Sequence, residues 1–307
     1  MPRAIVLYEI DQSFGPNILA DYYLKQDDKI PTMVLKEFSE KHVKKGYLDI
    51  TIRKDEDRFY SNKINAESIN KDNLYLSFIL QEGEDLISLK SIFENVEAKV
   101  IKDFSTDKQK MAGILKTSLN SILSLTQKLQ EPKIIKEILN EKTKKMLDDN
   151  LLQEARELID LGEEIPEKIA SEVKIAEDLL KNKEYRKARK SFLKASELAG
   201  LIQEEEIATF LQNKGEQVGM FPDLLKERDN LNKEIEKITS ELQNNKLYLY
   251  NSLVYPIDRL IEISNNLEED ELSGELIKFK NNIQRATRLA KDLEDLDNKI
   301  KENLNKI

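Results

Sequence analysis

The sequence lacks cysteine and tryptophan altogether, has one histidine, and uses glycine (9) and proline (7) sparingly over 307 residues. Without cysteine, disulfides, thiolate catalysis and cysteine-ligated zinc are excluded. The single histidine, His42, leaves no second imidazole for a metal site. A Ser-His-Asp catalytic triad could be built only on His42. Its neighbours Lys41 and Lys44 predict a solvated surface position for it. We predict no catalytic, cofactor-binding or metal-binding residue, and no enzymatic activity.

Long hydrophobic runs are also missing. No window approaches the 18 or more apolar residues that indicate a membrane-spanning helix. The first residues, MPRAIVLYEID, have neither the apolar segment nor the small-residue cleavage site of a secretory signal. We therefore expect a cytoplasmic protein without a transmembrane segment.

The acidic balance of the chain limits its partners. The net charge is −9, and neither part of the chain has a basic excess: Lys and Arg number 15 against 19 Asp and Glu in residues 1–104, and 34 against 39 afterwards. These totals disfavour a nucleic-acid groove. Hydrophobic residues at 39% and charged residues at 35% are typical of a folded, helix-rich protein and not of a disordered one.

Residues 1–104 hold 12 of the 20 Phe and Tyr residues and alternate between strand and helix patterns. Strands are expected at residues 4–10, 17–24, 47–52, 58–64 and 73–80, and helices at 31–46 and 84–104. In the third strand, Leu48, Ile50 and Ile52 should lie on one face and Tyr47, Asp49 and Thr51 on the other, because side chains alternate along a strand. The pattern predicts an antiparallel five-stranded sheet with helices packed on it.

This element order, together with the turn Asp11…Phe14-Gly15-Pro16 after the first strand, resembles the longin and roadblock-like group of small domains. The resemblance covers about a third of the chain. It implies a domain over residues 1–130, in which an amphipathic helix at 111–129 packs on the sheet. It also implies a protein that binds small GTPases, SNARE segments or other copies in trafficking and GTPase regulation. A different α+β ligand-binding domain, profilin-like or PAS-like, is the alternative.

The resemblance also suggests where a partner would bind. In related domains, partners engage the first helix with the adjoining strand, or the sheet edge. The exposed side of the helix expected at 31–46 carries the candidate partner-binding residues Glu37, Lys41, Lys44 and Lys45.

Residues 131–220 predict a helical bundle, with Gly162 and Pro166 marking a boundary between helices. Tyr185, Ala188, Phe192 and Ala195 are spaced 3, 4 and 3, a small-large-small stripe that resembles the second helix of a tetratricopeptide hairpin. The pattern is similar to microtubule-interacting-and-transport domains as well. Only one copy is visible, which favours a lone three-helix bundle, and a generic helical bundle is the preferred interpretation. Residues 167–218 could bind a peptide or act as a spacer.

Residues 221–307 predict an antiparallel coiled-coil hairpin. From Leu224 to Leu249 apolar positions alternate in steps of 4 and 3, with Asn245 on the seam. A polar turn at 265–275 precedes a second helix with the same pattern. The same helices could instead pair between two copies of the chain, as a homodimer.

Taken together, these features predict an α+β fold followed by an all-α body. The predicted function is that of a non-enzymatic adaptor without cofactors, which binds a small GTPase or trafficking protein through its N-terminal domain. The alternative is a small-molecule sensor whose sheet cups a ligand and signals through the helices.

Overall fold

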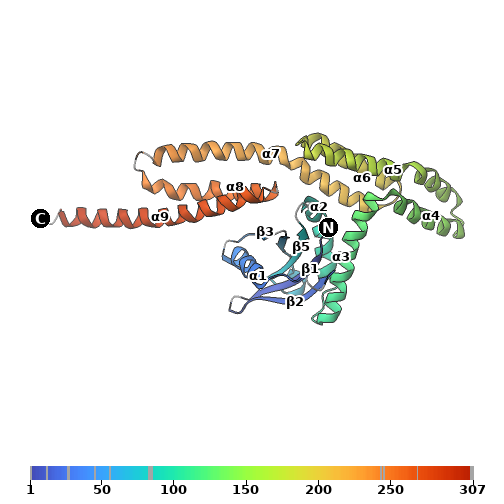
Figure 1. The fold of residues 1–307 in the computed structure, drawn as a ribbon, viewed down its shortest axis with the longest axis horizontal. Helices are drawn as coiled ribbons and strands as arrows, with labels where there is room; N and C mark the ends of the chain where they lie inside the picture. Colours follow the sequence, from blue (N-terminus) through green and yellow to red (C-terminus); the bar gives the residue numbers. More distant parts are fainter. Residues whose placement is uncertain are drawn as a thin grey trace. The chain divides into compact units, whose positions relative to one another are not determined.

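The computed structural model describes residues 2–11, 13–25, 28–44, 46–54, 57–81, 86–242, 244, 246–267 and 269–304. The chain forms two compact units, Met1–Gly219 and Met220–Ile307, and the boundary between them falls inside the long helix α7 (Figure 1). The expected further division of the first unit at residue 130 stays a prediction.

The N-terminal part is a five-stranded sheet in the order β2-β1-β5-β4-β3, with every neighbouring pair antiparallel. Its strands are β1 (Ala4–Asp11), β2 (Gly15–Tyr23), β3 (Asp49–Lys54), β4 (Asp57–Lys63) and β5 (Leu74–Gln81). The central strands β1 and β5 are apolar on both faces, as expected for strands covered on both sides. The sheet and the helices that follow it confirm the predicted α+β class.

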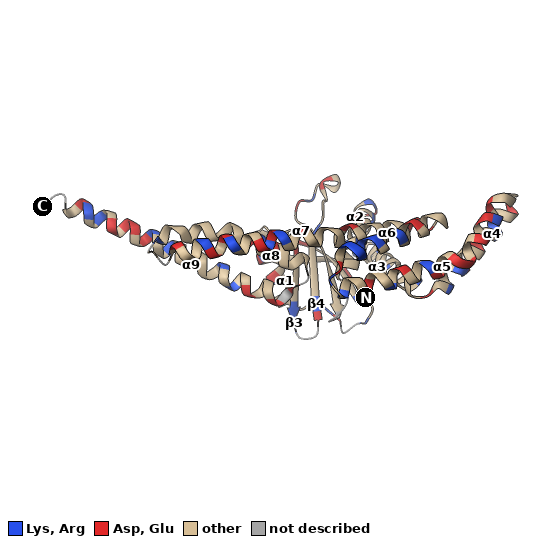
Figure 2. Ribbon diagram, turned by 90° about the horizontal axis from the view of Figure 1, so that it is seen from above, with Lys and Arg blue, Asp and Glu red and all other residues tan. Residues whose placement is uncertain are grey.

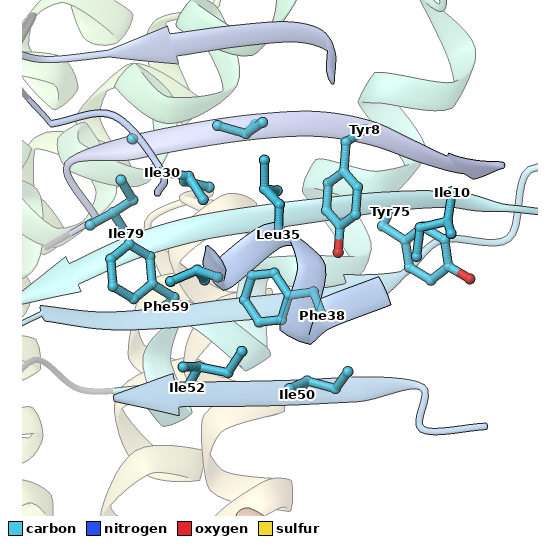
Figure 3. Packing of buried hydrophobic residues seen from close by; sticks show 13 residues of the cluster. Tyr8, Ile10, Ile30, Leu35, Phe38, Ile50, Ile52, Phe59, Tyr75 and Ile79 are labelled. Carbon is cyan, nitrogen blue, oxygen red and sulfur yellow. The ribbon is translucent and has the colours of Figure 1, made fainter. Parts of the chain in front are cut away.

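One face of the sheet is covered by helix α1 (Thr32–Ser39), which continues into a π-helical segment, η1 (Glu40–Lys44). Val34, Leu35 and Phe38 of α1 are at most 6% exposed, and they pack with Tyr8 and its strand neighbours in one hydrophobic cluster (Figure 3). The inner side of α1 therefore anchors the helix and leaves its outer side to solvent.

The other face is covered by α2 (Leu86–Lys102) and α3 (Lys108–Gln130). Phe93 of α2 places its ring edge-on against Tyr60 and Phe78, at centroid distances of 6.1 and 6.3 Å. Helix α3 lies against β2 and β1. It begins at Asp107, whose carboxylate accepts hydrogen bonds from two backbone amides of the first turn.

The expectation that Leu48 shares one face of the third strand with Ile50 and Ile52 is wrong. The Leu48 side chain is 68% exposed, while Ile50 and Ile52 are buried at 3% and 6%. The reason is that β3 begins only at Asp49, so Leu48 precedes the strand and does not follow its alternation.

The helical part of the first unit consists of α4 (Pro132–Asp148), α5 (Leu152–Lys181), α6 (Tyr185–Leu201) and the beginning of α7 (Glu205–Leu242). The predicted boundary at Gly162 and Pro166 is wrong, because α5 runs through both residues. A Cβ at Gly162 would come within 3.3 Å of Leu139 Cδ1 of α4, so this glycine allows α4 and α5 to approach closely and does not mark a helix end.

Three of the four residues of the predicted small-large-small stripe are 0% exposed, Ala188, Phe192 and Ala195, and Tyr185 is half-buried. Gly215 of α7 lies against this stripe, and a Cβ there would come within 3.2 Å of Phe192 Cβ. Small residues on both helices thus allow α6 and α7 to approach closely.

The second unit holds the rest of α7, a 3₁₀ segment η3 (Leu247–Leu253), α8 (Val254–Asn266) and α9 (Asp270–Leu304). A single helix from Leu224 through Leu249, as the heptad spacing predicted, is therefore wrong. Helix α7 ends at Leu242 and η3 begins at Leu247. Asn244 lies between them, and asparagine competes with helical hydrogen bonding. Asn245, the expected seam residue, lies outside the described residues.

After this interruption the chain folds back. Helix α8 runs antiparallel to the second half of α7 (Figure 1). Arg259 of α8 donates to Glu227 of α7 at 2.7 Å, and Arg228 of α7 donates to Glu269, just before α9, at 2.7 Å. Helix α8 ends at Asn266 and α9 begins at Asp270, so fewer residues separate the helices than the expected turn at 265–275. Among the helices in the described ranges, none has the length and apolar character needed to cross a membrane.

Candidate functional site

The hairpin between β1 and β2 ends in a turn organised by Asp11. Its Oδ1 atom accepts hydrogen bonds from the backbone amides of Ser13 (2.7 Å) and Phe14 (2.9 Å). Gly15 follows with φ of +84°, a conformation that side chains disfavour. These two amides, that of Phe14 first, hold the pKa of Asp11 below its ordinary value. The turn is thus locally specified, and it leaves the Phe14 side chain 93% exposed.

A hollow of about 310 Å³ lies between this turn and the outer side of α1 and η1. We call it the hairpin–helix groove. Its lining residues are Ile10, Asp11, Phe14, Gly15, Pro16, Lys36, Ser39, Glu40, Val43 and Lys44. Two of its apolar members, Phe14 and Val43, are 93% and 47% exposed. The groove therefore combines an exposed apolar patch with charges of both signs.

The structure describes three of the four candidate partner-binding residues. Glu37 and Lys41 form an ion pair one helical turn apart at 2.8 Å, and the Lys41 side chain is only 14% exposed. Lys44 pairs with Glu40 at 3.3 Å, is 72% exposed, and lines the groove. Lys45 lies outside the described residues. Lys44 is thus the candidate that this geometry brings to the groove.

The predicted surface position of His42 is wrong, because its residue is only 5% exposed. Its Nδ1 atom lies 2.7 Å from the carbonyl oxygen of Tyr47, and Nε2 lies 2.9 Å from Ser61 Oγ. Ser61 Oγ in turn lies 2.7 Å from the Tyr8 hydroxyl. A neutral imidazole protonated on Nδ1 satisfies the whole series: Tyr8 donates to Ser61, Ser61 to Nε2, and Nδ1 to the carbonyl.

Burial lowers the pKa of His42 from its ordinary 6.5 to about 4. The hydrogen bond to Tyr47 and the charge of Asp49 act in the opposite direction, but desolvation dominates. His42 is therefore neutral at pH 7 and links η1 to the sheet.

A second hollow, of about 190 Å³, lies on the opposite side of the sheet between α2, α3, α5 and α7. Its apolar lining includes Leu80, Leu89, Ile92, Ile122, Leu125 and Phe210. Ser88 and Glu177 also line it, and both contact the buried Lys214, at 2.9 and 3.6 Å. Among the described residues, no group of three or more His, Asp and Glu is placed to hold a metal ion.

Phe14 and Val43 were not among the residues singled out as candidates. A signal for Phe14 was present, since a large aromatic residue inside a Gly-Pro turn has no core to pack into. Val43 gave none, because its exposure depends on how η1 leaves the sheet. Comparisons of the chain with protein-family models, with curated proteins and with solved structures found no match.

Proposed function

We propose that the protein is a non-enzymatic adaptor that binds a protein partner through the hairpin–helix groove. The observation that carries the proposal is Phe14, a large aromatic side chain held 93% exposed by a hydrogen-bonded turn. Exposed apolar groups beside a hollow are typical of protein interaction sites. Binding energy in such sites concentrates in a few anchors, and aromatic side chains are favoured there.

The surroundings of Phe14 fit this role. Val43 and Pro16 extend the apolar patch, while Lys36, Lys44 and Glu40 supply a charged margin. Apolar contacts at the centre would provide affinity, and the charges would orient the partner and exclude wrong ones. The turn and α1 are both anchored to the sheet, so the patch is preorganised and little ordering is needed on binding.

A small GTPase or another trafficking protein is the proposed partner. The resemblance to longin and roadblock-like domains implies it, and the packing of α3 on β2 and β1 supports that resemblance. A cytoplasmic location belongs to the same proposal. The helices of the second unit would extend the molecule or pair it with a second copy.

The test is capture from lysate of the native host with the tagged full-length protein, in the presence of GDP or of a non-hydrolysable GTP analogue. We expect one nucleotide state to enrich a small GTPase, which is then purified for affinity measurements. Complete burial of a phenylalanine contributes about 2 kcal/mol. Phe14→Ala should therefore weaken binding by about 30-fold.

Leu152→Ala is the matched control, because Leu152 is also strongly exposed (64%) but lies on α5. It should leave the affinity unchanged. Charge reversal at Lys44 should mainly slow association and change its salt dependence. Equal affinities of the Phe14→Ala and wild-type proteins would refute the groove as the binding site, and capture of no GTPase would refute the partner class.

A small-molecule sensor is the second candidate function, and the hollow of about 190 Å³ beside Lys214 favours it. The pocket expected for a sensor lay under α1, where Val34 and Phe38 instead pack against the sheet. The alternative therefore moves to the opposite face of the sheet. Native mass spectrometry of the purified protein tests it, since a retained small molecule would support a sensor and an unmodified mass would not.

A further inference from the structure

A short segment around the start of α6 is strongly basic within this acidic protein. Residues 181–194 contain seven Lys and Arg residues and one acidic residue, Glu184, a formal charge of +6 in a chain of net charge −9. The totals for each part of the chain hid this segment, because the acidic residues of the neighbouring helices cancel it.

All seven cations are exposed. Those on α6 lie away from its buried stripe of Ala188, Phe192 and Ala195, and Figure 2 shows their blue bands along the helix. We call all seven together the α6 basic face: Lys181 at the end of α5, Lys183 in the turn before α6, and Arg186, Lys187, Arg189, Lys190 and Lys194 on α6. Arg186, Lys190 and Lys194 follow one another at intervals of four residues, on one side of the helix.

Acidic side chains of the chain itself neutralise only part of this face. Three of its cations form ion pairs: Lys181 with Asp178 at 3.9 Å, Lys187 with Glu184, and Lys194 with Glu172. In the part of the chain that the structure describes, the other four (Lys183, Arg186, Arg189 and Lys190) form no ion pair.

The arrangement does not stabilise the helix. Arg186 and Lys187 lie in the first turn of α6, where the helix dipole disfavours cations. Repulsion at four-residue spacing between Arg186 and Lys190 adds to this cost. Anions bound along the helix would remove both penalties, so the face is better suited to a bound state than to the free one.

The width of the basic face indicates what kind of anion fits. Helix α6 packs between α5 and the first part of α7, which bear the acidic residues Glu177, Asp178 and Glu216. Packed helices lie about 8–10 Å apart, close to the screening length of about 8 Å at physiological salt. A membrane surface or a nucleic-acid duplex would cover all three helices and meet these carboxylates. A single polypeptide segment would meet only the cations.

We propose that the α6 basic face binds an acidic segment of a partner protein. The segment would lie along α6, with Asp and Glu side chains spaced about 6 Å apart opposite successive turns, a spacing available to a helix or a strand. Its main contacts would be with Arg186 and Lys190, whose charges are uncompensated. This surface is separate from the hairpin–helix groove and does not depend on the partner proposed there.

The test measures fluorescence anisotropy of a short labelled peptide of alternating glutamate and serine, titrated with the full-length protein at low and at physiological salt. The variant Arg186→Glu/Lys190→Glu reverses two exposed, unpaired charges and places good helix formers in α6, so it should fold normally. The control Lys133→Glu/Lys144→Glu makes the same change in net charge on exposed positions of α4.

We expect the α6 variant to bind the peptide about tenfold more weakly than the wild type, and the α4 control to stay within about twofold. The affinity of the wild type should fall with salt. Equal losses in the two variants, or no binding at low salt, would overturn the proposal. Tighter binding to phosphatidylserine vesicles or to a DNA duplex than to the peptide would also overturn it, in favour of that other partner class.

Discussion

Acidification should destabilise the sheet domain through His42. The perturbation is one proton on Nε2, the atom that accepts from Ser61 at 2.9 Å. The imidazolium would donate there, so the Ser61 hydroxyl would have to turn toward Tyr8. The Tyr8 hydroxyl hydrogen would then lose its acceptor in a site where the residue is fully buried. The hydrogen bonds among Tyr8, Ser61 and His42 are therefore all satisfied when His42 is neutral and not when it is protonated.

The size of the effect follows from the pKa. His42 has a pKa of about 4 in the folded protein and an ordinary value of 6.5 when unfolded. Folded protein thus binds fewer protons than unfolded protein, and stability falls as the pH falls from 6.5 toward 4. At about 1.4 kcal/mol per pKa unit, the complete loss is about 3 kcal/mol. About 2 kcal/mol should already be lost near pH 5.

Two measurements check this expectation. Because His42 is the only histidine, its ring protons give a unique NMR signal whose titration reads the pKa directly. Urea unfolding followed by far-UV circular dichroism gives the free energy of unfolding at pH 7 and pH 5. The variant His42→Gln keeps a donor and an acceptor but does not titrate, so it subtracts the contribution of the carboxylates.

The wild type should lose about 2 kcal/mol more than His42→Gln between pH 7 and pH 5. An NMR pKa at or above 6.5, or parallel pH dependences of the two proteins, would refute the reasoning. Either result would mean that the imidazole is solvated and that the buried network does not form.

Glycine replacements test the packing of the first unit. In Gly113→Ala the new Cβ meets no neighbour within 4 Å, so this variant should raise the free energy of unfolding by about 0.5–1 kcal/mol. In Gly215→Ala the new Cβ contacts Phe192, so this variant should lower the melting temperature. Stabilisation by both variants would contradict the close approach of α6 and α7 at Gly215. In the second unit, Ile283→Ala (3% exposed) should cost about 2–4 kcal/mol and Leu296→Ala (56% exposed) less than about 0.5. A comparable loss at Leu296, dependent on protein concentration, would indicate pairing of α9 with a second copy.

Local patterns were sufficient for most elements of the sheet domain. Continuous apolar runs located the central strands β1 and β5, and alternation of apolar residues located β3, each within a few residues. The same rule misplaced Leu48, since alternation does not say where a strand begins. In the second unit, heptad spacing predicted one helix where the chain folds back. The period of the apolar residues cannot distinguish one continuous helix from two helices that fold back on each other, because both bury apolar stripes of the same spacing.

Candidate sites were harder to predict. Charge and helical spacing suggested Lys41 and Lys44 together, yet Lys41 pairs with Glu37 and only Lys44 reaches the groove. Phe14 was recognised as part of a turn, but its 93% exposure depends on how the described elements pack around that turn. The basic face of α6 was readable as a run of cations, whereas its isolation among acidic helices was not.

The sequence by itself determined the α+β class, the strand order along the chain, the turn at Asp11 and the amphipathic helices, because each depends on residues close together in the chain. The tertiary structure decided what lies on each surface. It buried His42 between Tyr75 and Ser61, it placed the hairpin turn beside η1 to form a groove, and it packed basic α6 between acidic neighbours. These features arise from contacts between residues far apart in sequence, which local periodicity and composition do not encode.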